Sequence, residues 1–282
     1  MSQLRIAIQG EPGSFSAAAT SLLLGDQLVE QKSCRHFGEV FELLNRGDVD
    51  RAVVPLENSL AGSVHQNYDL VREHRAWISA EVFVHVEHCL IGTSSSRIGG
   101  IDTVLSHPVA LEQCRGFLDQ HANWQVRREQ DTSGSVRTII ECGDNNLAAI
   151  ASAQAAEVYG GRVLARAIQD NENNYTRFVM LSKAREVAAS ANKVSILFSF
   201  KNLPGALHKA LSVFALRDID LTKIESRPQP GEIWKYIFYI DFLGRLDEER
   251  VQNALNHLGE VTDLLEVLGC YRADESIRRQ FL

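Results

Sequence analysis

The residues that folding explains least are residues 173–178, with the sequence NNYTRF. They carry amide, hydroxyl and guanidinium groups, which can donate hydrogen bonds to a ligand, and they lead into an apolar run at 179–181 that predicts a strand. If that strand begins at Thr176, then Thr176 and Phe178 share one face and Arg177 points to the other. From the residues alone, a loop that enters a strand explains the segment as well as a chemical role does.

Three more polar segments each follow a predicted strand and precede a predicted helix: residues 55–59 (PLENS), 106–108 (SHP) and 131–135 (DTSGS). Ligands of open α/β sheets lie outside the carboxyl ends of the strands, and the free N–H groups at helix starts favour anions. A single segment of this kind is more often only a capped helix. Three in the same domain shift the interpretation toward an anion-binding cleft.

The chain offers no motif for a metal or a nucleotide. The turn at residues 10–14 (GEPGS) lacks both the ending of a phosphate loop and the GxGxxG spacing. His85 and His88 lie three apart on a predicted strand, so they should face opposite sides. The cysteines are widely spaced and form no CxxC pair, which favours free thiols: Cys34, Cys89, Cys114, Cys142 and Cys270. We therefore expect no cofactor and no metal.

Charge and hydropathy argue against two classes of partner. The 282 residues carry a formal net charge of −7 without a block rich in Lys or Arg, which disfavours general nucleic-acid binding. The apolar runs fall short of the roughly 20 residues that a membrane helix needs, so we expect no membrane segment. Residues 1–6 enter a strand-like run without a basic and then apolar leader. The expected location is the cytoplasm, where thiols stay reduced.

Strand and helix signals alternate through residues 1–183, which predicts an α/β domain with a largely parallel sheet. The expected strands are 4–9, 51–54 (stopping at Pro55), 78–86, 103–105, 124–127, 147–151, 162–167 and 179–181, and the expected helices are 17–24, 40–44, 64–71, 108–118, 136–142 and one near Tyr159. Residues 184–192 have no strong apolar face and are interpreted as a linker. In residues 193–275, strands 193–200, 219–227, 234–242 and 261–270 and helices 205–217 and 247–258 predict a ferredoxin-like βαββαβ unit, a type that often forms oligomers.

At residues 174–178 the chain resembles the Thr-Arg-Phe signature of the prephenate dehydratase family. Further blocks resemble the same family in order along the chain: 13–15 (GSF), 57–59 (ENS) with 62–64 (GSV), and 106–114, which contains SHP, AL and QC. In the C-terminal unit, 205–207 (GAL) and 225–228 (ESRP) resemble the two phenylalanine-binding motifs of the ACT domain that this family carries. One departure is TSGSV at 132–136, where the family usually has small alanines at the last two positions.

The resemblance implies a catalytic domain of the two-lobed type II periplasmic-binding-protein-like fold, followed by the ACT domain. It also implies conversion of prephenate, a small anionic substrate, to phenylpyruvate, water and carbon dioxide in L-phenylalanine biosynthesis. L-Phenylalanine would be the allosteric ligand, and the assembly would be a homodimer or homotetramer. Arogenate dehydratase shares these motifs and stays open as an alternative. A non-catalytic amino-acid-binding protein of the same fold is the alternative from another class.

The family's functional residues carry over onto matching positions of this chain. The essential catalytic role falls to Thr176, and Glu57 is our candidate for a neighbouring proton source. The substrate-binding candidates are Asn58, Ser59, Ser106, Gln113, Thr132, Arg177 and Phe178. For Arg177, substrate contact and support of the cleft from behind carry equal weight. The regulatory candidates are Leu203, Gly205, Ala206, Leu207, Glu225, Ser226, Arg227 and Pro228, in two segments that meet across a dimer interface in related ACT domains.

Overall fold

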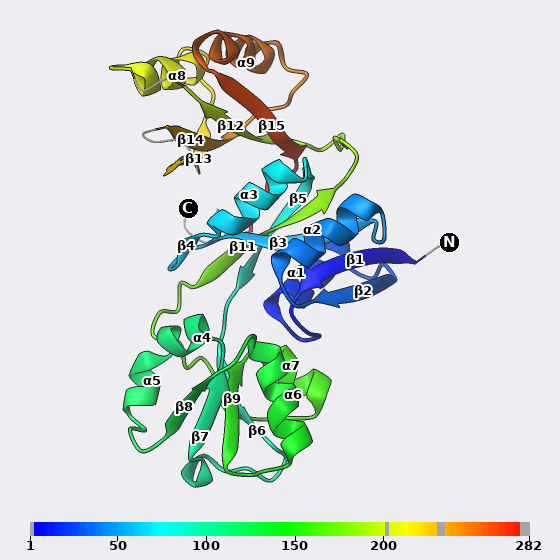
Figure 1. The fold of residues 1–282 in the computed structure, drawn as a ribbon, viewed down its shortest axis with the longest axis vertical. Coiled ribbons are helices and arrows are strands. Elements are labelled where there is room, and N and C mark those ends of the chain that lie inside the picture. Colours follow the sequence, from blue (N-terminus) through cyan, green and yellow to red (C-terminus); the bar gives the residue numbers. More distant parts are fainter. Residues whose placement is uncertain (1–2, 201–202, 230–234, 277–282) are drawn as a thin grey trace. The chain divides into compact units, whose positions relative to one another are not determined.

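The computed structural model of the chain describes residues 3–200, 203–229 and 235–276 (Figure 1). The contacts divide the chain into two compact units, one holding Met1–Tyr68 and Val82–Val179, the other Asp69–Glu81 and Met180–Leu282. The chain passes from one unit to the other within α3 (His65–Glu73), β5 (Trp77–His85) and β11 (Tyr175–Ser182). Within the expected catalytic segment, residues 1–183, Asp69–Glu81 thus group with the C-terminal residues. Among the described residues, no helix is both long and apolar enough to span a bilayer.

The first lobe of the first unit is built on a parallel sheet that starts with the N-terminal strand. Its elements are β1 (Leu4–Gln9), α1 (Phe15–Leu24), β2 (Val29–Cys34), α2 (Phe37–Arg46), β3 (Arg51–Asn58) and β4 (Gly62–Ser63), with β11 beside β3. β1 pairs in parallel with both β2 and β3, and Ile6 lies opposite Arg51 in that register. Ile6, Ile8 and Val53 are fully buried, because a sheet covered by helices needs apolar residues on its strands.

The second lobe is a five-stranded sheet covered on both faces. Its elements are β6 (Cys89–Gly92), a 3₁₀ turn (Ile98–Gly100), β7 (Thr103–Ser106), α4 (Pro108–Gln113), α5 (Arg115–Asp119), β8 (Gln125–Arg128), α6 (Thr132–Cys142), β9 (Leu147–Ala151), α7 (Ala153–Tyr159) and β10 (Arg162–Ala165). The strand order is β10-β6-β9-β7-β8. Neighbouring strand residues belong to different cores: Val104 packs with α4 and α5, and Leu105 with α6 and α7. Figure 1 shows these helix pairs on opposite faces.

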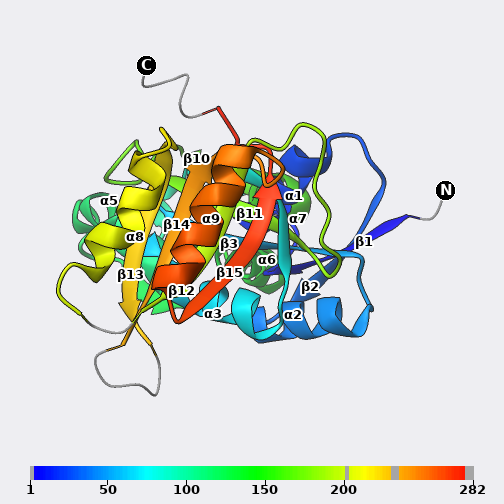
Figure 2. The same ribbon diagram turned by 90° about the horizontal axis from the view of Figure 1, so that it is seen from above.

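The C-terminal part of the second unit confirms the expected βαββαβ order. Its elements are β12 (Lys193–Ser199), α8 (Ala206–Ala215), β13 (Leu221–Pro228), β14 (Tyr236–Leu243), α9 (Glu249–Val261) and β15 (Leu264–Tyr271). The antiparallel strands follow the order β13-β14-β12-β15. Figure 2 shows α8 and α9 covering a face of this sheet. Phe198, Phe214 and Phe242 lie in the core between the two layers. The expected start of the third strand at residue 234 falls outside the described residues.

Residues 69–81 join the second unit through a close backbone contact and a buried ion pair. Gly269 of β15 pairs with Ile78 of β5, and a Cβ atom on Gly269 would lie 2.4 Å from the Ile78 carbonyl oxygen. Lys193 Nζ lies 3.0 and 2.9 Å from the two carboxylate oxygens of Glu81, and both side chains are buried. Asp241 Oδ2 lies 3.8 Å from the same nitrogen, so two buried carboxylates compensate the Lys193 charge.

Three local expectations differ from the structure. β3 does not stop at Pro55 but runs on to Asn58. Its pairing with β1 ends at Val53, so the missing N–H of proline removes no bond of that ladder. The expected helix 108–118 is divided at Cys114, which leaves helical geometry at φ −115° and ψ 22°. β2 and β6 were not expected, because β2 is mostly polar and β6 has only four residues.

Candidate active site

A cleft of about 520 Å³ lies within the first unit and is lined by residues of both lobes. Its size falls in the range of small-molecule sites. The first residues of three helices line it: Phe15 of α1, Phe37 of α2 and Thr132 of α6. The N-terminal ends of these helices carry partial positive charge and free N–H groups, which suit an anionic ligand. The exposed Arg35 adds a full positive charge to the lining.

Thr176 stands in the cleft wall with its hydroxyl group held by an amide. Asn58 Nδ2 donates to Thr176 Oγ1 at 2.9 Å and to Asn174 Oδ1 at 2.7 Å. The orientation of the Asn58 amide follows from its other end, since Oδ1 accepts from the backbone N–H groups of Leu60 and Ala61. Thr176 Oγ1 is therefore an acceptor in this bond, and its own hydrogen stays available for a ligand.

The same chain of amides continues to a buried histidine. Asn174 Nδ2 donates to Gln113 Oε1 at 3.1 Å, and His88 Nε2 lies 2.9 Å from the same oxygen. Asn174 and His88 are almost fully buried, and burial lowers the pKa of His88, opposed only by its bond to Gln113. Because Gln113 Oε1 is engaged by two donors, its NH₂ group is the end that it can offer to a ligand.

The structure brings together five of the nine expected catalytic and substrate-binding residues. Those that line the cleft are Thr176, Asn58, Gln113, Thr132 and Phe178. The other four, which do not line it, are Glu57, Ser59, Ser106 and Arg177. Thr176 and Phe178 face the cleft and Arg177 does not, as the alternation along a strand predicts.

Arg177 and Glu57 lie together away from the cleft. Arg177 is 3% exposed, and its Nη1 lies 3.9 Å from Glu57 Oε2. Arg177 is therefore buried beside Glu57 and does not line the cleft. The expectation that Glu57 supplies a proton to Thr176 finds no support in this geometry. Glu57 does not line the cleft, whereas the next residue on β3, Asn58, does.

Two expected substrate-binding serines make protein contacts instead. Ser59 Oγ donates to Asn173 O at 2.8 Å and accepts from Tyr175 N at 2.9 Å. Ser106, fully buried, donates to Ile150 O at 2.6 Å. Ser59 thus binds the backbone of the segment that leads to Thr176. Ser106 links β7 to β9 by a hydrogen bond.

The two lobes meet at the turn that precedes α1. Ser152 Oγ donates to Gly13 O at 2.7 Å, and Ser133 Oγ donates to Pro12 O at 2.5 Å. Gly13 has φ +82°, and a Cβ atom there would lie 2.7 Å from Ala155 Cα. Glycine at this position permits both the turn and the close approach of the lobes. The unusual TSGSV segment contributes Ser133 to this contact.

Sequence reasoning missed three residues of this site, Arg35, His36 and His88, and it singled out the segment of Asn174 without giving that residue a role. Arg35 and His36 follow the carboxyl end of β2, and recognising that strand would have pointed to them. His88 lies on the segment that joins β5 to β6, where no local pattern marks a site. His85 and His88 have different partners, since His85 Nε2 bonds to Glu172 O.

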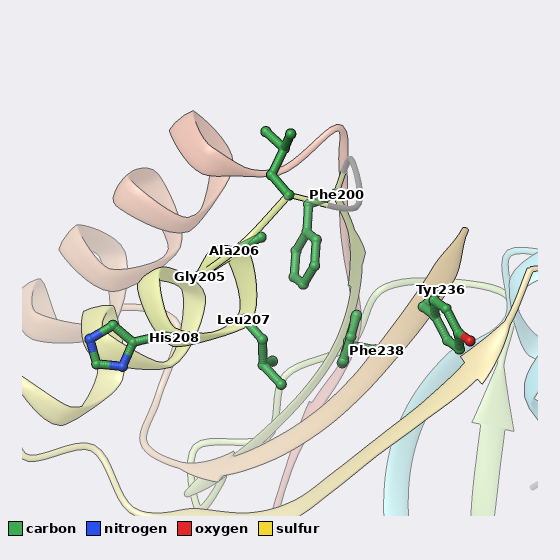
Figure 3. Close-up of a pocket in the computed structure, with 8 residues that line it drawn as sticks. Phe200, Gly205, Ala206, Leu207, His208, Tyr236 and Phe238 are labelled. Atoms are coloured by element: carbon green, nitrogen blue, oxygen red, sulfur yellow. The ribbon is translucent and has the colours of Figure 1, made fainter. Parts of the chain in front are cut away.

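A second pocket, of about 210 Å³, lies in the C-terminal part of the second unit. Figure 3 shows Phe200, Leu207 and Phe238 gathered beside the turn at Gly205. All four expected regulatory residues of this turn line the pocket: Leu203, Gly205, Ala206 and Leu207. The segment 225–228 does not line it. Glu225 pairs with Lys223 at 3.0 Å instead, and Arg227 with Asp69 at 2.8 Å.

The fold and cleft define a two-lobed α/β enzyme of the small-molecule-binding type with an appended regulatory-type domain. The model of the prephenate dehydratase family matches residues 6–186, and that of the ACT domain matches residues 194–260. The chain therefore belongs to the prephenate dehydratase family and carries a C-terminal ACT domain. It is accordingly a lyase.

Three relatives illustrate the similarity. Arogenate dehydratase/prephenate dehydratase 1 of Arabidopsis thaliana, a chloroplastic protein, is 40% identical over 97% of this chain and 73% of its own length. The crystal structure of prephenate dehydratase from Arthrobacter aurescens in complex with L-Phe has a TM-score of 0.85 and 29% identity, over 96% of this chain and 90% of that one. GqqA, described as a quorum-quenching acylase, has a TM-score of 0.87 and 32% identity, over 98% and 100% of the chains.

Proposed function

We propose that this enzyme converts prephenate to phenylpyruvate, water and carbon dioxide, with Thr176 assisting the departure of the ring hydroxyl. The observation that carries the proposal is the bond from Asn58 Nδ2 to Thr176 Oγ1, which leaves the threonine hydrogen available to a ligand in an anion-favouring cleft. The family membership and the names of the plant relatives support this substrate class.

The reaction breaks two bonds and makes the ring aromatic. The carbon–carbon bond to the ring carboxylate breaks, its electron pair completes the aromatic ring, and the carbon–oxygen pair leaves with the hydroxyl. Aromatisation drives the step, and the obstacle is the departing hydroxide. Thr176 donates a hydrogen bond to that oxygen in the transition state, and the bond it accepts from Asn58 strengthens it as a donor. Solvent water supplies the proton that leaves in the product water.

The two carboxylates of the substrate need different surroundings. The pyruvyl carboxylate has donors in the Gln113 NH₂ group, Arg35 and the N–H groups at the helix starts. The ring carboxylate must release its charge into the ring, so a strong ion pair would oppose its loss. The buried wall near Phe178 and Phe15 offers it a drier setting.

Formation of phenylpyruvate from prephenate by the purified chain tests the proposal directly. Prephenate and arogenate offered side by side establish the preferred substrate, since arogenate carries an amino group in place of the keto group. Absence of product from both would contradict dehydration. An acylase assay tests the alternative that the description of GqqA raises. Dehydration is favoured because the family model that matches residues 6–186 is that of prephenate dehydratase.

We further propose feedback inhibition by L-phenylalanine at the pocket of Figure 3. Gly205 has φ +79°, and the start of α8 has no side-chain cap, so its N–H groups can receive an amino-acid carboxylate. Phe200, Leu207 and Phe238 suit an aromatic side chain. The Arthrobacter aurescens relative was solved with L-Phe, which supports this ligand.

The segment 225–228 does not line this pocket within one chain. A second copy of the chain could bring its own segment 225–228 to the pocket and complete the site. β13 is an edge strand whose Ile224 is 49% exposed, and Leu203, in the turn before α8, is 63% exposed. A homodimer or homotetramer in the cytoplasm is our proposal, while the names of several plant relatives place those proteins in chloroplasts.

Calorimetric titration with L-phenylalanine tests the regulatory proposal. Ser226→Ala should weaken binding and inhibition together with little change in basal turnover, and a tenth of the affinity corresponds to about 1.4 kcal/mol. Thr222→Ala, on the same strand and also exposed, is the matched control. Unchanged inhibition in the Ser226 variant would remove this strand from the site.

A further inference from the structure

His88 presents a buried acceptor that the mechanism above does not use. Its side chain is 2% exposed and lines the cleft, and no hydrogen-bond partner for Nδ1 is found among the described residues. The ring of Phe15 stands at 84° to it with centroids 5.6 Å apart. Buried polar atoms are nearly always bonded, so an unpartnered atom in a cleft wall indicates a group that awaits its ligand.

The protonation of the ring follows from the amide chain. The backbone N–H groups of Leu60 and Ala61 fix Asn58 Oδ1 as an acceptor. Asn58 Nδ2 then donates to Asn174 Oδ1, and Asn174 Nδ2 to Gln113 Oε1. Because that oxygen has no hydrogen to give, His88 Nε2 must carry the proton.

In a neutral ring with a proton on Nε2, Nδ1 has a lone pair and no hydrogen. At Nδ1, His88 is therefore a pure acceptor. It would reject a carboxylate and accept an O–H or N–H group of a ligand. This polarity is opposite to that of Gln113, Arg35 and the helix starts, which offer donors.

We propose that His88 Nδ1 accepts a hydrogen bond from the ring hydroxyl of the substrate, a specificity contact that rests on the proposed dehydration. Prephenate has two carboxylates, a keto group and one hydroxyl, so at neutral pH the hydroxyl is the donor it can offer. The hydroxyl hydrogen points to His88, and the oxygen lone pairs are then free to receive the hydrogen of Thr176. The departing oxygen keeps its own hydrogen, which points to His88, and takes the second from solvent water while Thr176 donates a hydrogen bond to it, so it leaves as water.

Nitrogen-15 NMR of the full chain, labelled at its nine histidines, tests the tautomer and the contact. The Thr176→Ala variant is used for the titration because prephenate should bind to it with little turnover. The His88 resonances are assigned as the set of signals that is lost in His88→Gln. We expect an unprotonated Nδ1 in the free protein and an upfield shift of that signal on addition of prephenate. A protonated Nδ1, or a signal that prephenate leaves in place, overturns the proposal.

His88 would make two hydrogen bonds, one from the substrate to Nδ1 and one from Nε2 to Gln113. Two variants at position 88 separate their effects. A glutamine at position 88 can keep the donor to Gln113 in the place of Nε2 and lose the acceptor, whereas an asparagine can keep an acceptor near Nδ1 and lose that donor. We expect His88→Gln to lower kcat/KM about tenfold, the size of one lost hydrogen bond, and His88→Asn to lower it less. Full activity of His88→Gln would leave the residue with a structural role alone and overturn the assignment.

The two substrates identify the donor. The loss in His88→Gln should be equal for prephenate and arogenate, because both carry the ring hydroxyl. A loss confined to arogenate would place its ammonium group at Nδ1 and overturn the hydroxyl assignment. If the wild-type enzyme forms no phenylpyruvate, the proposed function itself is wrong. If the wild type is active but prephenate does not move the Nδ1 signal, only the assignment to His88 is wrong.

Discussion

Asn58 Nδ2 lies 2.9 Å from Thr176 Oγ1, although the two residues are 118 positions apart in the sequence. The bond joins β3 to β11 in the cleft wall and leaves the threonine hydrogen available as a donor. The first two predictions test this pair.

Thr176→Ala should lower kcat by at least about 10² with KM near normal, because the lost bond acts mainly in the transition state. Thr176→Ser keeps the hydroxyl and should retain much more activity. Steady-state formation of phenylpyruvate measures both. Thr138→Ala is the control, since Thr138 bonds to Gly134 O on α6 and does not line the cleft. Equal kcat in the wild type and the alanine variant would exclude a role for this hydroxyl.

Asn58→Asp should lower kcat at least about tenfold while preserving the shape of the side chain. A carboxylate cannot donate to Thr176, so the threonine would turn its hydrogen toward the new acceptor. It would also face Asn174 Oδ1 and Tyr175 O, which lie 2.7 and 3.2 Å from the nitrogen it replaces. The unmet acceptors should reduce the free energy of unfolding by about 1–3 kcal/mol. Urea unfolding beside the kinetics checks both effects, and an unaltered kcat would show that Thr176 does not depend on this amide.

Gly13→Ala should destabilise the protein by about 1–3 kcal/mol and reduce turnover. The new Cβ would meet Ala155 Cα at 2.7 Å and force the contact between the lobes apart. Gly143→Ala is the matched control, because φ there is +69° but nothing lies within 4 Å of the added atom. Both variants suffer backbone strain, and only the first disturbs the lobe contact. Equal turnover in the two variants would argue against a role for this contact in catalysis.

His88 should make the stability of the protein fall as the pH drops below about 6.5. Burial lowers the folded-state pKa below its usual value of 6.5, so below that pH the unfolded chain binds a proton that the folded chain does not. The loss is at most about 1.4 kcal/mol per pH unit and ends at the folded-state pKa. Between pH 7.5 and 5.5, His88→Gln should therefore lose less unfolding free energy than the wild type. His36→Gln, at a side chain 75% exposed, is the control. Parallel pH dependence in the wild type and His88→Gln would show that this histidine is not kept neutral by the fold.

Much of the local structure could be predicted because it depends on short-range patterns. The strands at Leu4–Gln9 and Leu147–Ala151 agree with the expected bounds, since each is a short apolar run between turn residues. The polar strand Val29–Cys34 could not be recognised this way, because half of it faces solvent at the edge of the sheet. Arg35 and His36 were missed with it.

The sequence by itself determined the family, the βαββαβ order of the C-terminal unit and the faces of the strand that carries Thr176. These depend on motifs and on a period of two residues, which are local properties. Only the tertiary structure decided which side chains meet. It placed Asn58 beside Thr176, and Glu57 beside Arg177 away from the cleft, because strand pairing brings together residues more than 100 positions apart. It also fixed the tautomer of His88, since a chain of hydrogen bonds has a direction only when all its members are in place.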